Sequence, residues 1–186
     1  MIAVGIPADV ARGIRLVSLD VDGVLTDGSF TSEVSDSAVT ESRRFSVLDG
    51  LGIHLLQSAG LTVAFVSGKR SAAVEARARD LGVEEVHLDL PFGKVEAIEG
   101  MLQRNGWSWT QVAHLGDDLA DLAVLERAGL PAAVANAVPE VREIADWVGE
   151  VRGGEGAVRE FARALLDSRG EWAEQVRKYV EKGRRS

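Results

Sequence analysis

The order of apolar and polar positions along the chain predicts buried strands alternating with amphipathic helices. Short apolar runs rich in β-branched residues predict strands near 14–20, 61–66, 83–90, 111–115, 131–135 and 146–148. Apolar residues at helical spacing predict helices near 49–59, 71–81 and 91–104, one ending at 128, and one over 157–168. Because the connections are short, this pattern predicts an α/β fold, a doubly wound parallel sheet in one domain spanning 1–186.

Three segments depart from that alternation. Residues 28–45 mix Ser, Thr, Asp and Glu with single apolar residues, which predicts a β-hairpin flap with a turn near 35–37. The hairpin, one helix and one strand fill the interval between 22 and 67, so we expect no helical cap domain. Residues 1–13 are predicted to be a short leader, and 169–186 a polar C-terminal tail, helical or loose.

Composition narrows the possible partners. The chain has 186 residues, 46% of them hydrophobic, with a net charge of −8, which argues against nucleic acid or an anionic membrane as the main partner. An anionic substrate remains compatible, since it meets only a local site. The absence of cysteine means that a metal would be held by oxygen or histidine. Without a signal-peptide pattern or a long apolar run, a cytoplasmic protein is expected.

The first predicted strand ends in two carboxylates, Asp20 and Asp22. Two acids a few ångströms apart resist ionising together unless a cation lies between them or one keeps its proton. Asp22 is followed by Gly23, however, and Asp-Gly is also a common turn dipeptide. This stretch alone leaves both interpretations open.

Other reactive residue types follow further strands of the predicted sheet. They are Ser67, Lys94, Asp117, Asp118 and Asp121. Each has an ordinary explanation by itself: a turn, an exposed lysine or a helix N-cap. The carboxyl ends of parallel strands meet at one edge of a sheet, however, so all these groups are expected to converge there. Together they favour phosphoryl transfer, in which carboxylates attack phosphorus, move protons and hold Mg²⁺ while a hydroxyl and an ammonium bind the phosphoryl group. The three histidines are scattered, which predicts core or surface placement.

The same residues resemble a known family. The segments 20–24, 67–68, 94 and 116–121 match, in order, the four motifs of the haloacid dehalogenase-like (HAD) phosphohydrolases. Further segments resemble its capless branch, the 3-deoxy-D-manno-octulosonate 8-phosphate (KDO 8-phosphate) phosphatases and their nine-carbon sugar-acid relatives. These are 22–28, 49–53, Arg77 with 81–83, and 153–160, and the resemblance covers about 14–168.

The resemblance implies an Mg²⁺-dependent phosphatase of a sugar-acid phosphate that works through an aspartyl-phosphate. Asp20 would be the nucleophile and Asp22 the general acid/base. Mg²⁺ would be bound by the Asp20 carboxylate, the Asp22 carbonyl and Asp117. The remaining roles fall to Ser67, Gly68 and Lys94 for the phosphoryl group, to Asp118 and Asp121 for orienting waters or Lys94, and to Lys69 and Arg77 for the leaving group. In that branch a neighbouring subunit closes the site, which implies a homotetramer.

Several positions depart from the branch and keep alternatives open. Leu48 stands where these enzymes carry an arginine, and Asp89-Leu90 where they carry Gln-Gly. At the position of Lys69, KDO 8-phosphate phosphatases carry an arginine and the nine-carbon relatives tend to carry a glutamate. The positive charge of Lys69 therefore favours the eight-carbon substrate. The alternatives are a nine-carbon or other small phosphomonoester, a receiver-like phospho-accepting signalling domain, and a non-catalytic assembly partner. A receiver would place its acidic pair, phospho-acceptor, hydroxyl and lysine in a different order.

Overall fold

The protein is built on one six-stranded sheet. In the computed structural model, residues 5–35 and 38–184 are described. All neighbouring strands of the sheet are parallel, in the order β5-β4-β1-β6-β7-β8. The strands are β1 (Leu16–Leu19), β4 (Thr62–Val66), β5 (Glu85–His87), β6 (Val112–Gly116), β7 (Leu130–Ala133) and β8 (Trp147–Val148). The predicted parallel sheet is confirmed.

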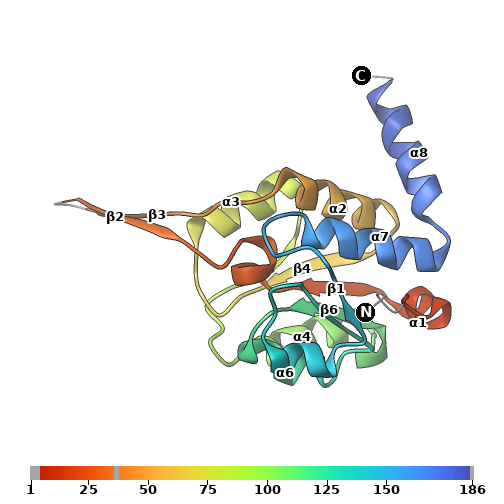
Figure 1. Ribbon diagram of the computed structural model, residues 1–186, viewed down its shortest axis with the longest axis horizontal. Helices are drawn as coiled ribbons and strands as arrows, with labels where there is room; N and C mark the ends of the chain where they lie inside the picture. The colour runs from red at the N-terminus through yellow and green to blue at the C-terminus, as the bar shows by residue number, and fades with distance from the viewer. Residues whose placement is uncertain (1–4, 36–37, 185–186) are drawn as a thin grey trace.

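Helices cover both faces of this sheet. The helices of the described residues are α1 (Ala8–Gly13), α2 (Val47–Ser58), α3 (Ala72–Leu81), α4 (Lys94–Asn105), α5 (Leu122–Leu125), α6 (Pro139–Ile144), α7 (Ala157–Arg169) and α8 (Trp172–Gly183). Figure 1 shows α2, α3 and α7 above the sheet and α4 and α6 below it. This is the doubly wound arrangement that the sequence predicts. None of the helices in the described ranges is long and apolar enough to cross a membrane.

Strand β1 occupies the middle of the sheet, and its one polar side chain, Ser18, is paired with His114 Nδ1 at 3.1 Å. All four of its residues are buried, and it pairs with β4 on one side and β6 on the other. A strand covered on both faces is mostly apolar in sequence, and three of the four residues of Leu16–Leu19 are apolar. Its carboxyl end therefore opens between the ends of two neighbouring strands.

The segment 49–53, which resembles the phosphatase branch, lies where α2 packs on α7. Asp49 is buried in the first turn of α2, and its Oδ1 accepts a hydrogen bond from the backbone N–H of Arg159 at 3.0 Å. Burial raises the pKa of Asp49 to about 6. A Cβ on Gly52 would lie 2.8 Å from the Arg159 Cα, so the glycine allows the two helices to touch. These residues fasten the helices together.

The structure changes the prediction for the first residues of the chain and decides between the two alternatives for the last ones. The leader prediction is wrong for residues 8–13, which form α1, and Arg169 Nη1 donates to the carbonyls of Ala11 at 3.1 Å and Ile14 at 3.2 Å. The tail is helical, and Figure 1 shows α8 extending away from the sheet. The third strand is shorter than predicted because Asp89 adopts a left-handed conformation, with φ of 64°.

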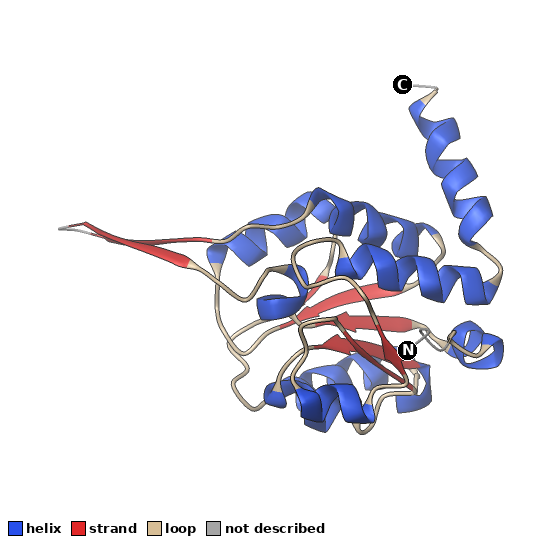
Figure 2. Ribbon diagram, in the orientation of Figure 1, coloured by secondary structure: helices blue, strands red, loops and turns tan. Residues whose placement is uncertain are grey.

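The predicted hairpin is present after the first strand. Strands β2 (Thr31–Ser35) and β3 (Ala38–Ser42) pair antiparallel, and Figure 2 shows them projecting from the body of the molecule. The turn predicted near 35–37 falls partly outside the described residues. Along the hairpin Val34 is exposed, and Phe30 at its base is half-exposed. The insertion between β1 and α2 is therefore a two-stranded hairpin.

Candidate active site

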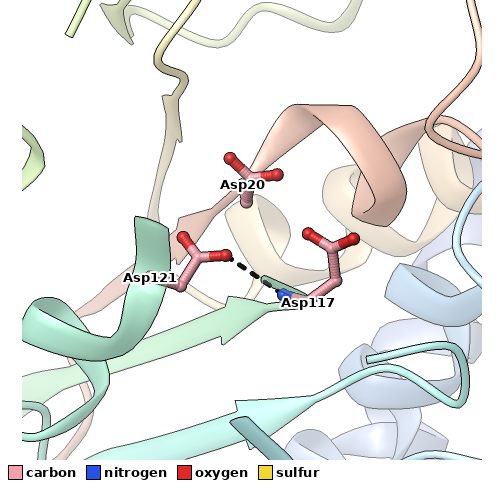
Figure 3. Close-up of side chains that lie close together, drawn as sticks. All are labelled: Asp20, Asp117 and Asp121. Carbon is pink, nitrogen blue, oxygen red and sulfur yellow. Dashed lines mark hydrogen bonds between the residues drawn. The ribbon is translucent and has the colours of Figure 1, made fainter. Parts of the chain in front are cut away.

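Three carboxylates gather where β1 and β6 end. Asp20 follows β1, Asp117 follows β6, and Asp121 closes the short helical turn η3 (Leu119–Asp121) (Figure 3). One oxygen from each carboxylate lies within 4.8 Å of the others. The backbone N–H of Asp20 donates to the Leu115 carbonyl at 3.1 Å, so the pairing of β1 with β6 continues up to the cluster. The parallel register thus brings together residues about a hundred positions apart.

Lys94 links two of these carboxylates. It begins α4, is buried, and its Nζ donates to Asp20 Oδ1 at 2.5 Å and to Asp121 Oδ1 at 2.8 Å. Burial by itself would lower the pKa of Lys94, but the two carboxylates raise it above its ordinary value. The ammonium group therefore stays charged beside Asp20.

Asp121 has its hydrogen-bonding capacity filled by the protein. Besides Lys94, its Oδ1 accepts from His114 Nε2 at 2.9 Å, and its Oδ2 accepts from the backbone N–H groups of Asp117 and Asp118 at 3.1 and 3.4 Å. Burial alone would raise the pKa of Asp121, but His114 and Lys94 hold it below its ordinary range. Asp121 is thus an ionised anchor for Lys94 with no oxygen left over for a metal.

The other two carboxylates of the cluster fit a divalent cation. Burial, together with the neighbouring Asp121 and Asp118, raises the pKa of Asp117 to about 7, and burial and Asp121 raise that of Asp20 well above its ordinary value. A Cβ on Gly23, whose φ is 102°, would lie 1.9 Å from Asp117 Oδ2, so only glycine lets Asp117 approach the loop after β1. Buried, crowded carboxylate oxygens are the ligands that Mg²⁺ prefers.

Asp22 points to a different partner. Its carboxylate Oδ1 accepts a hydrogen bond from Arg43 Nη1, and these two residues stand 21 positions apart. The Asp22 side chain is 23% exposed and that of Arg43 only 1%. Arg43 was not among the residues singled out from the sequence, because no local pattern marks an arginine at the base of a hairpin as buried.

Ser67 stands at the end of β4, one strand away from Asp20. The residue is buried, and its Oγ accepts from the backbone N–H of Lys69 at 3.2 Å. Lys69 Nζ lies 5.0 Å from the ring centroid of Phe30, so this lysine reaches the base of the hairpin. Ser67 is thus held by the turn after β4, and Lys69 extends from that turn to the hairpin.

Comparisons with known proteins identify this arrangement. Residues 91–160 match the model of the haloacid dehalogenase-like hydrolase family. The 3-deoxy-D-manno-octulosonate 8-phosphate phosphatase of Escherichia coli (strain K12) is 38% identical over 168 residues, covering 89% of this chain and 87% of that protein. The chain belongs to the haloacid dehalogenase-like hydrolases. The predicted membership of their KDO 8-phosphate phosphatase branch is likewise confirmed.

Solved structures of similar proteins support the family and its metal. The hydrolase superposes on the Moraxella catarrhalis 3-deoxy-D-manno-octulosonate 8-phosphate phosphatase in complex with magnesium, phosphate and KDO, with a TM-score of 0.85, 32% identity, and coverage of 92% of this chain and 97% of that one. It also resembles the cobalt-bound enzyme from Haemophilus influenzae, with a TM-score of 0.80, 35% identity, and coverage of 87% and 92%. The divalent cation predicted from the sequence agrees with these relatives and with the acidic cluster.

Two predicted site residues of the hydrolase direct their side chains to partners outside the carboxylate cluster. Arg77 on α3 donates from Nη1 to Asp80 Oδ2 at 2.8 Å and from Nη2 to the Ser46 carbonyl at 3.2 Å. Asp118 is exposed, and its side chain accepts from the backbone N–H of Leu119 at 2.7 Å as the cap of η3. Within this chain, Arg77 contacts α2 and Asp118 shapes the loop that carries Asp117.

Removal of the divalent cation is expected to lower thermal stability in a pH-dependent way. In the folded apoprotein Asp117 has a pKa of about 7, against about 3.8 when unfolded, so its carboxylate costs stability increasingly as pH rises between these values. Mg²⁺ binds only the ionised carboxylate. The Mg²⁺-induced rise in melting temperature should therefore grow from about pH 6 to about pH 8. At a hundredfold excess of Mg²⁺ over Kd, the binding adds about 2.7 kcal/mol to the free energy of unfolding.

Two asparagine variants serve as the controls. Asp117→Asn should lose the Mg²⁺-induced shift at every pH, whereas Asp118→Asn, on the exposed side of the same loop, should keep it. An undiminished shift in Asp117→Asn would remove this carboxylate from the metal site.

Proposed function

We propose that this hydrolase is an Mg²⁺-dependent phosphatase that releases phosphate from 3-deoxy-D-manno-octulosonate 8-phosphate or a closely related keto sugar-acid phosphate. The observation that carries the proposal is the buried Asp20–Lys94–Asp121 chain beside Asp117. It combines a nucleophile, a fixed cation and oxygen ligands for a metal at one edge of the sheet. The similar enzymes from Escherichia coli and Moraxella catarrhalis bear the name of this activity.

The first half of the reaction uses Asp20 and Asp22. Lys94 binds Oδ1 of Asp20, so the other carboxylate oxygen attacks phosphorus. As the new O–P bond forms, the bond from phosphorus to the sugar oxygen breaks, and Asp22 gives its proton to that oxygen. The charged Lys94, together with Ser67 and the backbone at Gly68, binds the phosphoryl oxygens. The product is a sugar acid and an aspartyl-phosphate.

The second half regenerates the carboxylate. Asp22, now ionised, takes a proton from a water that attacks phosphorus, and the bond between phosphorus and Asp20 breaks to release phosphate. Asp20, Asp117 and the Asp22 carbonyl would hold the Mg²⁺, which when bound neutralises negative charge on the phosphoryl group. Asp121 keeps Lys94 in place through both steps.

Recognition of the sugar acid is assigned to Lys69 and Arg77. Lys69 extends from the loop after β4 to the base of the hairpin, close to Phe30. Arg77 lies on α3 against Asp80 and Ser46, away from the Asp20 cluster of its own chain. It would therefore serve the site of a neighbouring subunit in a homotetramer. Light scattering tests the assembly, and an active monomer would contradict it.

We also propose that the whole chain forms one catalytic domain and works in the cytoplasm. The six strands share one sheet, and the insertion that follows β1 is a hairpin. The sequence contains no cysteine, and the part of the chain that the structure describes has no helix able to span a membrane.

A phosphate-release screen tests the proposed substrate. We expect the highest kcat/KM with KDO 8-phosphate, lower values with nine-carbon sugar-acid phosphates and simple sugar phosphates, and none in excess EDTA. Arg77→Ala should raise KM for the sugar-acid phosphate with little effect on p-nitrophenyl phosphate, which has no carboxylate to bind. A preference for simple sugar phosphates would overturn the sugar-acid assignment. Stable phosphorylation without turnover would favour the receiver-like alternative.

A further inference from the structure

Arg43 is a buried cation at the base of an otherwise exposed hairpin. It directly follows β3, yet its side chain is only 1% exposed. Its Nη1 donates to Asp22 Oδ1, and its Nε donates to Glu41 Oε1 at 2.7 Å. The guanidinium carbon also lies 5.9 Å from the ring centroid of Phe30. Arg43 therefore connects the hairpin to the loop that follows β1.

The contact with Asp22 determines how that carboxylate is held. A guanidinium stays charged at all physiological pH values, so burying it is costly unless carboxylates pair with it. Within the described residues, Arg43 is the hydrogen-bond partner found for the Asp22 carboxylate. Arg43 Nη2 is buried without a partner in that same part of the chain, so removing the side chain unpairs only Asp22 and Glu41.

We propose that Arg43 is a positioning residue for Asp22, an inference that rests on the proposed function. By binding Oδ1, Arg43 leaves the other oxygen of Asp22 to carry the proton that Asp22 gives to the leaving group and later takes from water. The hairpin thereby acts on the acid/base step through the residue that directly follows β3.

A purely structural salt bridge would behave differently. If Arg43 only fastened the hairpin, its loss would slow the hydrolysis of every substrate alike. If Arg43 acts through Asp22, its loss slows hydrolysis most for the substrates whose leaving group must receive a proton. An alkyl sugar phosphate needs that proton, whereas p-nitrophenyl phosphate, with its stable leaving anion, needs it little.

The experiment compares Arg43→Met and Arg43→Lys with two reference variants on both substrates. Asp22→Asn should lose about 10²–10⁴-fold in kcat on the sugar phosphate and far less on p-nitrophenyl phosphate. Arg43→Met should lose about 10–100-fold on the sugar phosphate and only a few-fold on the aryl phosphate. Arg43→Lys should recover part of the loss, since it keeps the charge. Arg44→Met is the matched control, because the neighbouring Arg44 is 75% exposed and pairs with Asp27.

The double variant Asp22→Asn with Arg43→Met completes the cycle. It should be no slower than Asp22→Asn alone, because a positioning residue has nothing left to position. The inference would be overturned if the kcat losses of the two single variants multiply in the double variant. An equal loss of kcat on both substrates in Arg43→Met would also overturn it. If Arg43→Met does not fold by circular dichroism, Arg43→Lys decides by the same substrate comparison. An equal loss on both substrates in Asp22→Asn itself would instead refute the acid/base role in the proposed function.

Discussion

Replacing Asp20 by asparagine is expected to abolish turnover while leaving the protein folded. The amide has nearly the same shape but no nucleophilic oxygen, so steady-state hydrolysis should fall by about 10⁴-fold or more. Burial and Asp121 raise the pKa of Asp20 well above its ordinary value, which means that its charge is costly in the apoprotein. The variant should therefore melt at the wild-type temperature or higher when Mg²⁺ is absent.

Asp118→Asn is the matched control for this change. Asp118 is an exposed carboxylate at the same rim, and its side chain caps η3. It should keep kcat within a few-fold of the wild-type value. Phosphate release is the measurement, supported by a search for acid-stable phosphoprotein, which should form in the wild type and be absent from Asp20→Asn. Steady-state hydrolysis above background in the purified variant would remove Asp20 from the nucleophile role.

Replacing Lys94 by methionine should damage both stability and activity. Methionine fills much of the same space, but Asp20 and Asp121 lose the ammonium that they share. Breaking a buried ion pair on one side typically costs about 3–5 kcal/mol, and losing one donor to the phosphoryl group lowers kcat by about 10²–10³-fold. Lys94 holds the pKa of Asp20 down, so without it Asp20 should bind a proton more readily. The stability deficit should accordingly shrink as pH falls.

A second change separates the two effects of Lys94. Adding Asp121→Asn to Lys94→Met removes one unpaired carboxylate and should restore part of the free energy of unfolding, measured by urea denaturation. It should not restore kcat, because the phosphoryl group still lacks its cation. Lys178→Met, on the exposed surface of α8, is the control and should change neither quantity. A kcat within about tenfold of wild type in Lys94→Met would contradict the phosphoryl-binding role.

The sheet, its helices and the gathering of strand-end residues could be predicted from the sequence. Each depends on short-range signals: apolar runs such as 63–66 form strands wherever both faces become covered, and the carboxyl ends of parallel strands share one edge. The same reasoning failed for residues 8–13, where a short amphipathic turn in α1 is stabilised by Arg169, far along the chain. It also overran β5, whose end depends on the conformation of one residue, Asp89.

Only the tertiary structure decided which polar groups meet. His114 was predicted to lie in the core or on the surface, and it is fully buried, but its contact with Asp121 depends on how η3 folds back over β6. The contact of Arg43 with Asp22 depends on the angle at which the hairpin leaves the sheet. Hydrophobic periodicity in the sequence indicates which face of a helix or strand is apolar, and local motifs indicate which residues can react. The partner of a buried charge is chosen by register and by chain direction over long separations, which no local pattern encodes.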